Sequence, residues 1–156
     1  MQHLLSLLAC ACILLTFACQ NETCAEERGL IPIEEYIANN NLTVEDTTIS
    51  GVTFFYNIER LGGSARPNLQ SDIEIIYQGR ETNDGVFDET PTGETSRFPL
   101  SRLIAGWQLG IPLIGEGGKI TLYLPSQLGY GVRGAGDAVC PNSDLIFDVE
   151  LIDFSN

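Results

Sequence analysis

The sequence has few basic residues for its size. Only 8 of its 156 residues are Lys or Arg, against 21 Asp or Glu, which gives a formal net charge of -13. Proteins that bind nucleic acid neutralise phosphate groups with clustered basic side chains. This balance therefore excludes nucleic acid as a partner.

Histidine is almost absent. The single one, His3, lies in an apolar leading segment. If that segment is cleaved, the mature chain has no imidazole, which excludes Ser-His-Asp and Cys-His nucleophile systems, histidine general bases and histidine-ligated zinc. The remaining chemistry must use carboxylates, hydroxyls, backbone groups or the shape of a pocket.

The rest of the composition is that of one globular domain. Apolar residues make up 44% of the chain and charged residues only 19%, so there is enough apolar material for a core. The length suits a single domain, and there is no internal repeat or low-complexity tract.

The first 18 residues carry no Lys, Arg, Asp or Glu. Their apolar run, residues 4–18, is shorter than the ~20 residues of a membrane-spanning helix and predicts a signal peptide. Ala18 stands directly before Cys19, and polar residues follow. This junction resembles a bacterial lipoprotein signal, in which Cys19 becomes the lipidated first residue; plain secretory cleavage and an uncleaved anchor are the alternatives. We expect a protein of the bacterial cell envelope, anchored to a membrane through Cys19 on the periplasmic or surface side.

The chain has five cysteines. Cys10 and Cys12 would leave with the signal peptide and Cys19 would carry the lipid, so Cys24 and Cys140 remain. An oxidising compartment favours a disulfide between them. We favour the other interpretation, in which Cys24 lies in a mobile tether and Cys140 is a separate thiol. Neither has a C-x-x-C partner, so redox catalysis and a zinc site lack support.

The segment before the main domain divides into two parts. Residues 19–31 begin polar and acidic and lack periodicity, which is typical of a flexible tether. Residues 32–49 form a predicted helical extension. There, Pro32 at a helix start and apolar Ile33, Tyr36 and Ile37 at helical spacing predict a short helix that ends at the following asparagines.

From residue 50 to 156 the apolar period becomes twofold, which predicts strands. One segment differs: residues 101–109 read as a short helix with Ser101 as its N-cap. The expected fold is therefore α+β, with a curved antiparallel sheet wrapped around one short helix. The predicted strands are residues 52–61, 72–77, 119–124 and 145–152.

Several aromatic residues recur beside glycines at the ends of these elements, and singly each is typical of a core position. Together, five blocks resemble an FKBP-type peptidyl-prolyl cis/trans isomerase in order and approximate spacing, over about residues 50–154. The blocks are YQG at 77–79, VFD at 86–88, LIAGW at 103–107, LGYG at 128–131 and PNSDLIFDVEL at 141–151.

The resemblance implies an FKBP-like half-barrel and a hydrophobic pocket for a prolyl side chain. Asp88 would lie at the rim, either orienting the substrate or making a structural bond to a neighbouring strand or loop. The family's additional aromatic wall maps to Ser96 or Phe98, Ala135 stands where some members have histidine, and Cys140 replaces a usual proline. Trp107 would be the floor, with Tyr77, Phe87, Phe147, Leu103, Ile104 and Val139 as walls, and the Ile104 N–H and Tyr130 hydroxyl would bind substrate carbonyls.

The implied activity suits a chain without histidine. Rotation about an X–Pro bond transfers no proton and needs no nucleophile, cofactor or metal. The expected function is a rotamase that assists extracytoplasmic folding of proline-containing polypeptides, with macrolide-type compounds as inhibitors. The alternative is a non-catalytic binding module in a cell-envelope complex.

Overall fold

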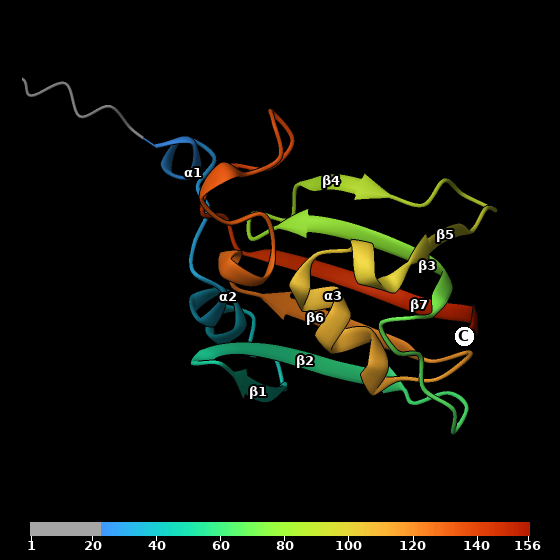
Figure 1. Ribbon diagram of the computed structural model, residues 1–156. Helices are drawn as coiled ribbons and strands as arrows, with labels where there is room; N and C mark the ends of the chain where they lie inside the picture. Colours follow the sequence, from blue (N-terminus) through green and yellow to red (C-terminus); the bar gives the residue numbers. More distant parts are fainter. Residues whose placement is uncertain (1–22) are drawn as a thin grey trace, which may run out of the picture.

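A computed structural model describes residues 23–156 of the chain. Seven strands form one open, antiparallel sheet in the order β1-β2-β6-β7-β3-β4, and β5 also pairs with β3 (Figure 1). The strands are β1 (Glu45–Ile49), β2 (Val52–Arg60), β3 (Asp72–Glu81), β4 (Val86–Glu89), β5 (Ser96–Pro99), β6 (Lys119–Leu124) and β7 (Leu145–Ser155).

Within the described residues, three short α-helices accompany the sheet: α1 (Cys24–Glu27), α2 (Ile33–Asn39) and α3 (Ala105–Gly110). None of the helices in residues 23–156 has the length and apolar character needed to cross a bilayer. Single 3₁₀ turns η1 (Leu100–Arg102), η2 (Ile111–Leu113), η3 (Ser126–Leu128) and η4 (Gly131–Arg133) connect the other elements.

The main core lies between α3 and the inner face of the sheet. Alternate residues of β7, among them Phe147 and Val149, are buried there, as the twofold pattern predicted. Two glycines bring α3 close to β6. A Cβ at Gly106 would lie 2.3 Å from the Leu124 side chain, and one at Gly110 would lie 2.4 Å from that of Leu122. The absence of side chains at these two positions therefore sets the distance between α3 and the sheet.

A second, smaller core lies on the outer face, where α2 packs. Ile33 and Tyr36 of α2 are buried against Tyr123 of β6 and Ile146 of β7. Figure 1 shows α2 beside the sheet near the end where β7 begins. The sheet is thus covered by a helix on both of its faces at this end.

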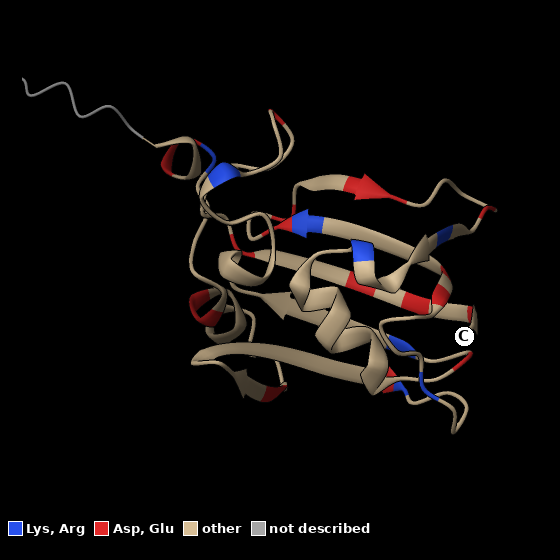
Figure 2. Cartoon of the chain, viewed as in Figure 1, with Lys and Arg blue, Asp and Glu red and all other residues tan. Residues whose placement is uncertain are grey.

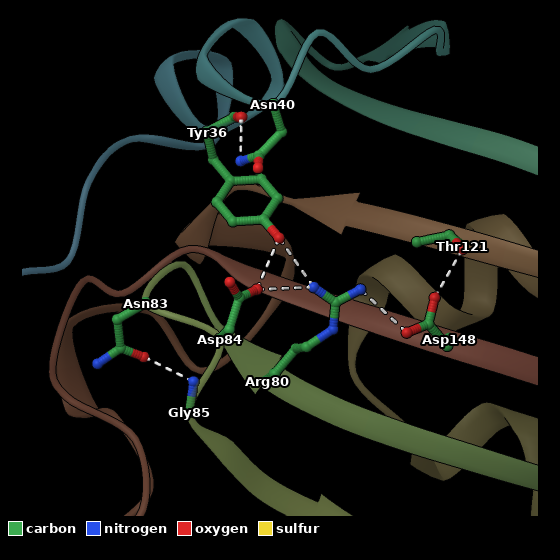
Figure 3. Close-up of polar contacts among 8 residues, drawn as sticks. All are labelled: Tyr36, Asn40, Arg80, Asn83, Asp84, Gly85, Thr121 and Asp148. Carbon is green, nitrogen blue, oxygen red and sulfur yellow. Dashed lines mark hydrogen bonds and ion pairs between the residues drawn. The ribbon is translucent and has the colours of Figure 1, made fainter.

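Polar contacts fix α2 to the sheet (Figure 3). The Tyr36 hydroxyl donates to Asp84 Oδ1 at 2.7 Å and accepts from Arg80 Nη1 at 2.9 Å. Arg80 also forms ion pairs with Asp84 and Asp148, each at 3.0 Å, and Thr121 donates to Asp148 at 2.7 Å. The network joins α2, the turn after β3, and strands β3, β6 and β7.

The predicted α+β class and the four predicted strands are confirmed, with differences at the boundaries. Strand β3 continues past Tyr77 to Glu81, and the short strands β1, β4 and β5 were not predicted. The extension 32–49 is helical only in its first part, because its last five residues form β1.

The predicted start of the central helix is wrong. Ser101 lies in η1, and α3 begins only at Ala105, with Ile104 as an N-cap that makes no side-chain bond. Leu103 between them is extended, with φ -89° and ψ 171°. This break separates the two helical segments.

The predicted tether contains regular structure in its described part. Residues 24–27 form α1, with a Thr23–Glu26 capping box, and Arg28 and Ile31 bond residues of the domain. The favoured interpretation of the cysteines is wrong, because Cys24 and Cys140 form a disulfide across 116 residues. The helix is too short to show periodicity, and the Thr-x-x-Glu pattern at residues 23–26 is its one sequence signal. The disulfide could not be assigned without geometry. The predicted signal peptide and Cys19 lie outside the described residues.

Candidate active site

A cavity of about 160 Å³ opens between α3, the inner side of the sheet and the loop that follows β6. Its wall is mostly aromatic or aliphatic, and Asp88 is its one acidic residue. The lining residues are Tyr77, Asp88, Phe98, Leu103, Ile104, Trp107, Tyr130 and Phe147.

Six aromatic rings form a continuous chain of tilted contacts at this cavity. Trp107 stands at its centre, with ring centroids 5.1 Å from both Tyr77 and Phe147 and interplanar angles of 80° and 89°. Phe98 extends the chain beyond Tyr77 at 6.4 Å. Phe87 extends it from Phe147 at 5.6 Å to Tyr130 at 6.4 Å. Such edge-to-face contacts hold each ring in one orientation.

Gly79 of β3 makes room for this packing. A Cβ at that position would lie 2.7 Å from the Phe147 ring and 2.8 Å from the Phe87 ring. Both distances are shorter than a real contact allows. The YQG block therefore supplies the ring of Tyr77 and, two residues later, the space that two other rings require.

The break before α3 places two further pocket residues. Because Leu103 is extended and Ile104 is the N-cap, both side chains lie at the cavity and not along a helix face. The N–H of Ile104 makes no backbone hydrogen bond with the described residues. It remains available to a ligand, as N-terminal helix donors often are.

The carboxylate and one of the two phenols of the site are paired with each other, and the hydroxyl of the other phenol, Tyr130, bonds no group in residues 23–156. The Tyr77 hydroxyl donates to Asp88 Oδ2 at 2.7 Å. Burial, followed by this hydrogen bond to the carboxylate, raises the pKa of Tyr77. Burial and then the nearby charge of Asp88 raise the pKa of Tyr130, so both phenols stay protonated at neutral pH.

Trp107 carries a buried donor that the described residues do not satisfy. The side chain is 4% exposed, and its Nε1 has no hydrogen-bond partner in residues 23–156. Buried polar atoms are nearly always paired, so an orphan donor of this kind is typical of a site with a function.

Within residues 23–156, no three His, Cys, Asp or Glu side chains gather in a way that could hold a metal ion.

The structure brings most of the predicted site residues to the cavity. Two of them do not line it: Phe87 contacts Phe147 and Tyr130 of the lining, and Val139 is buried in the main core. Phe98, which the sequence left undecided against Ser96, lines the pocket. Asp88 occupies the rim, and its bond goes to Tyr77 on the neighbouring strand.

Comparison with known proteins identifies this arrangement. Residues 63–152 match the family described as FKBP-type peptidyl-prolyl cis-trans isomerase. The chain belongs to this FKBP family. Over 128 residues it is 38% identical to the probable FKBP-type peptidyl-prolyl cis-trans isomerase FkpA of Neisseria meningitidis serogroup B, a match that covers 81% of this chain and 45% of the relative.

Solved structures give the same FKBP fold. The crystal structure of FkpA from Escherichia coli superposes with a TM-score of 0.70 at 33% identity, covering 79% of this chain and 57% of that one. A peptidyl-prolyl cis-trans isomerase from Pseudomonas syringae pv. tomato has a TM-score of 0.71 at 26% identity, with 86% and 98% covered. The chain spans less than half the length of the first curated relatives it matches.

Proposed function

We propose that this FKBP domain is a peptidyl-prolyl cis/trans isomerase that accelerates rotation about X–Pro bonds in polypeptide clients. One observation carries the proposal. The pocket combines a wall of aromatic rings with two donors at its edge, the Ile104 N–H and the Tyr130 hydroxyl. This is a site that can enclose a prolyl ring and hold the carbonyl groups beside it.

The physical chemistry of the reaction matches these groups. The barrier to rotation, ~18–20 kcal/mol, comes from amide resonance in the planar bond. A dry pocket disfavours the charge-separated planar form, and hydrogen bonds that suit a twisted bond favour the transition state over the ground state. Neither effect needs a proton acceptor, a nucleophile or a metal.

Each pocket residue has a separate part in this proposal. The Trp107 ring is the floor on which the prolyl ring lies, and Tyr77, Phe98 and Phe147 are the walls. The Ile104 N–H and the Tyr130 hydroxyl donate to substrate carbonyl oxygens. Asp88 accepts from the Tyr77 hydroxyl and thereby orients that ring.

The setting of the activity is also part of the proposal. The leader of residues 1–18 and the Ala18–Cys19 junction support attachment to a membrane of the bacterial envelope through a lipid on Cys19. The Cys24–Cys140 disulfide supports an oxidising compartment. The clients are then proline-containing polypeptides outside the cytoplasm, where uncatalysed isomerisation takes tens of seconds.

A peptide assay tests the activity. The protein is mixed with a short X–Pro peptide, and conversion from cis to trans is followed with and without a macrolide that fills FKBP pockets. We expect acceleration that the macrolide abolishes. A folded protein that leaves the rate unchanged would contradict the proposal and favour a non-catalytic binding module.

A further inference from the structure

The segment from the start of η4 to the residue before β7 connects the pocket to the N-terminal extension. Residues 131–144, called here the pocket loop, begin directly after Tyr130, which lines the pocket. Asn142 N donates to Gly131 O at 2.8 Å, which closes the loop at its base. Val139, near its middle, is 1% exposed and packs in the same core as Trp107 and Phe147. A shift of this loop therefore moves the Tyr130 side of the pocket.

The pocket loop has little regular structure to hold it in place. Besides the 3₁₀ turn η4, its ladder contact is one isolated bridge between Ala135 and Val139. Gly131, Gly134 and Gly136 all have positive φ. Glycine-rich segments of this kind have many accessible conformations, so bonds from outside the loop decide which one is populated.

Several of those bonds come from the segment that precedes the domain. Arg28, directly after α1, donates from Nη1 to Ala138 O at 3.1 Å and from Nη2 to Asp137 O. The neighbouring Cys24 is joined to Cys140 by the disulfide. Figure 1 shows α1 lying beside this loop.

A buried carboxylate completes the connection. Glu81, the last residue of β3, has a side chain that is only 4% exposed. Its Oε2 accepts from Arg28 Nη1 at 2.8 Å, and its Oε1 accepts from the Cys140 backbone N–H at 3.2 Å. A buried carboxylate requires such partners, because an unpaired charge is costly inside a protein. Strand β3, the pocket loop and the extension therefore meet at one side chain.

We propose that Arg28, Glu81 and the Cys24–Cys140 disulfide, together called the clamp, are positioning residues for the active site. They hold the pocket loop in the conformation that places the Tyr130 hydroxyl for the substrate carbonyl. They act through Tyr130 and do not touch the substrate themselves. The inference rests on the proposed isomerase function and adds to it a role for the segment before the domain.

A double-mutant cycle with Tyr130 tests the proposal. We compare the wild type with Arg28→Gln and with the double variant Cys24→Ser, Cys140→Ser. Each of these is also combined with Tyr130→Phe. The readouts are kcat/KM on an X–Pro peptide and hydrogen exchange at the amides of residues 133–142. Arg60→Gln is the control, because Arg60, like Arg28, bonds a carboxylate (Glu150) and a backbone carbonyl (Gly117), and none of these three residues lines the pocket.

We expect each clamp variant to lower kcat/KM by about three- to tenfold, the value of one substrate hydrogen bond, and to speed amide exchange in the pocket loop. In the Tyr130→Phe background the same substitutions should lower kcat/KM by less than about twofold, because the hydroxyl that the clamp positions is absent. Arg60→Gln should leave both readouts unchanged.

Two results would overturn the clamp: unchanged exchange and activity in both variants, or a full loss of activity that persists in the Tyr130→Phe background. An inactive wild type would instead contradict the proposed function. The same double-mutant cycle would then be measured as the affinity for a prolyl peptide, because the Tyr130 hydroxyl donates to a bound peptide in an isomerase and in a binding module alike.

Discussion

Among single residues, Trp107 is the one on which the proposed activity depends most. Its ring contacts Tyr77 and Phe147, and its side chain is almost fully buried. We expect Trp107→Ala to lower kcat/KM by at least about tenfold, because the surface that receives the prolyl ring is lost. The folded state should survive but lose about 3–5 kcal/mol of stability. Peptide isomerisation and urea unfolding measure the two effects.

Tyr123→Ala is the matched control. Tyr123 is also a buried aromatic residue, at 6% exposed, but it packs in the outer core beneath α2. This variant should lose comparable stability and keep its activity while folded. Unchanged turnover in Trp107→Ala would show that the cavity is not the active site.

The pH dependence of the reaction follows from the same pocket. No imidazole is present in residues 23–156, and the pKa of Tyr77 and that of Tyr130 are both raised, chiefly by burial. A raised phenol pKa keeps each hydroxyl protonated, and able to donate, until well above neutral pH. We expect kcat/KM to vary by less than about twofold between about pH 6 and pH 9. A bell-shaped profile measured in that range would instead indicate proton transfer.

The sequence located the pocket residues only in part, for reasons specific to each. Trp107, Tyr77 and Phe147 stand in blocks whose spacing is close to that of the family. Phe98 lies where the chain is shorter. Both it and Ser96 pair with β3 on the same face of β5, so only the position of the cavity in the folded chain decides between them. Val139 is apolar and near the site in the sequence, but three-dimensional packing turns it into the core.

Among the helices and strands, α2 stabilises the folded domain but supplies no residue that lines the pocket. Ile33 is fully buried against the outer face, and its N–H donates to Asp144 at 2.9 Å. We expect Ile33→Ala to lower the free energy of unfolding by about 2–5 kcal/mol and to leave kcat/KM of the folded protein unchanged. Urea unfolding and the peptide assay measure this pair of outcomes.

Glu35→Ala in the same helix is the control, because Glu35 is exposed and its loss should change stability little. If Ile33→Ala reduced turnover as much as stability, α2 would have to act on the pocket. The two faces of the sheet would then be coupled.

Strands could be predicted where the alternation of apolar and polar residues extends over many residues. Strand β7, with eleven residues, and β2, with nine, alternate clearly. The unpredicted strands β1, β4 and β5 have four or five residues each and are mostly exposed, so their pairing partners define them and their own pattern does not. The start of α3 was misplaced because Ser101 is a good N-cap type, whereas the extended backbone of Leu103 delays the helix.

In the molecule as a whole, acidic residues are spread over both strands and helices and are absent from the central helix. Figure 2 shows Asp and Glu along β3, β4 and β7 and on α1 and α2, while α3 carries no charged residue. A net charge of -13 keeps copies of the protein apart and disfavours non-specific contact with acidic surfaces. Approach to a membrane would then depend on a specific anchor.

The proposed lipid anchor gives a testable prediction for the protein that includes residues 1–22. We expect the wild-type protein, expressed in a bacterium, to fractionate with membranes through a lipid on Cys19. Cys19→Ala should release it, because the lipid carries the attachment. Cys24→Ala serves as the control and should remain with the membrane. If Cys19→Ala stays membrane-bound, the lipoprotein interpretation is wrong.

Exchange spectroscopy by NMR on an intact X–Pro peptide, with a catalytic amount of the protein, tests the proposed isomerase activity most directly. We expect faster interconversion in both directions, an unchanged cis to trans ratio, and equal rates in H₂O and D₂O, because the pocket twists the bond without moving a proton. A peptide that binds without faster interconversion, or a large solvent isotope effect, would contradict it.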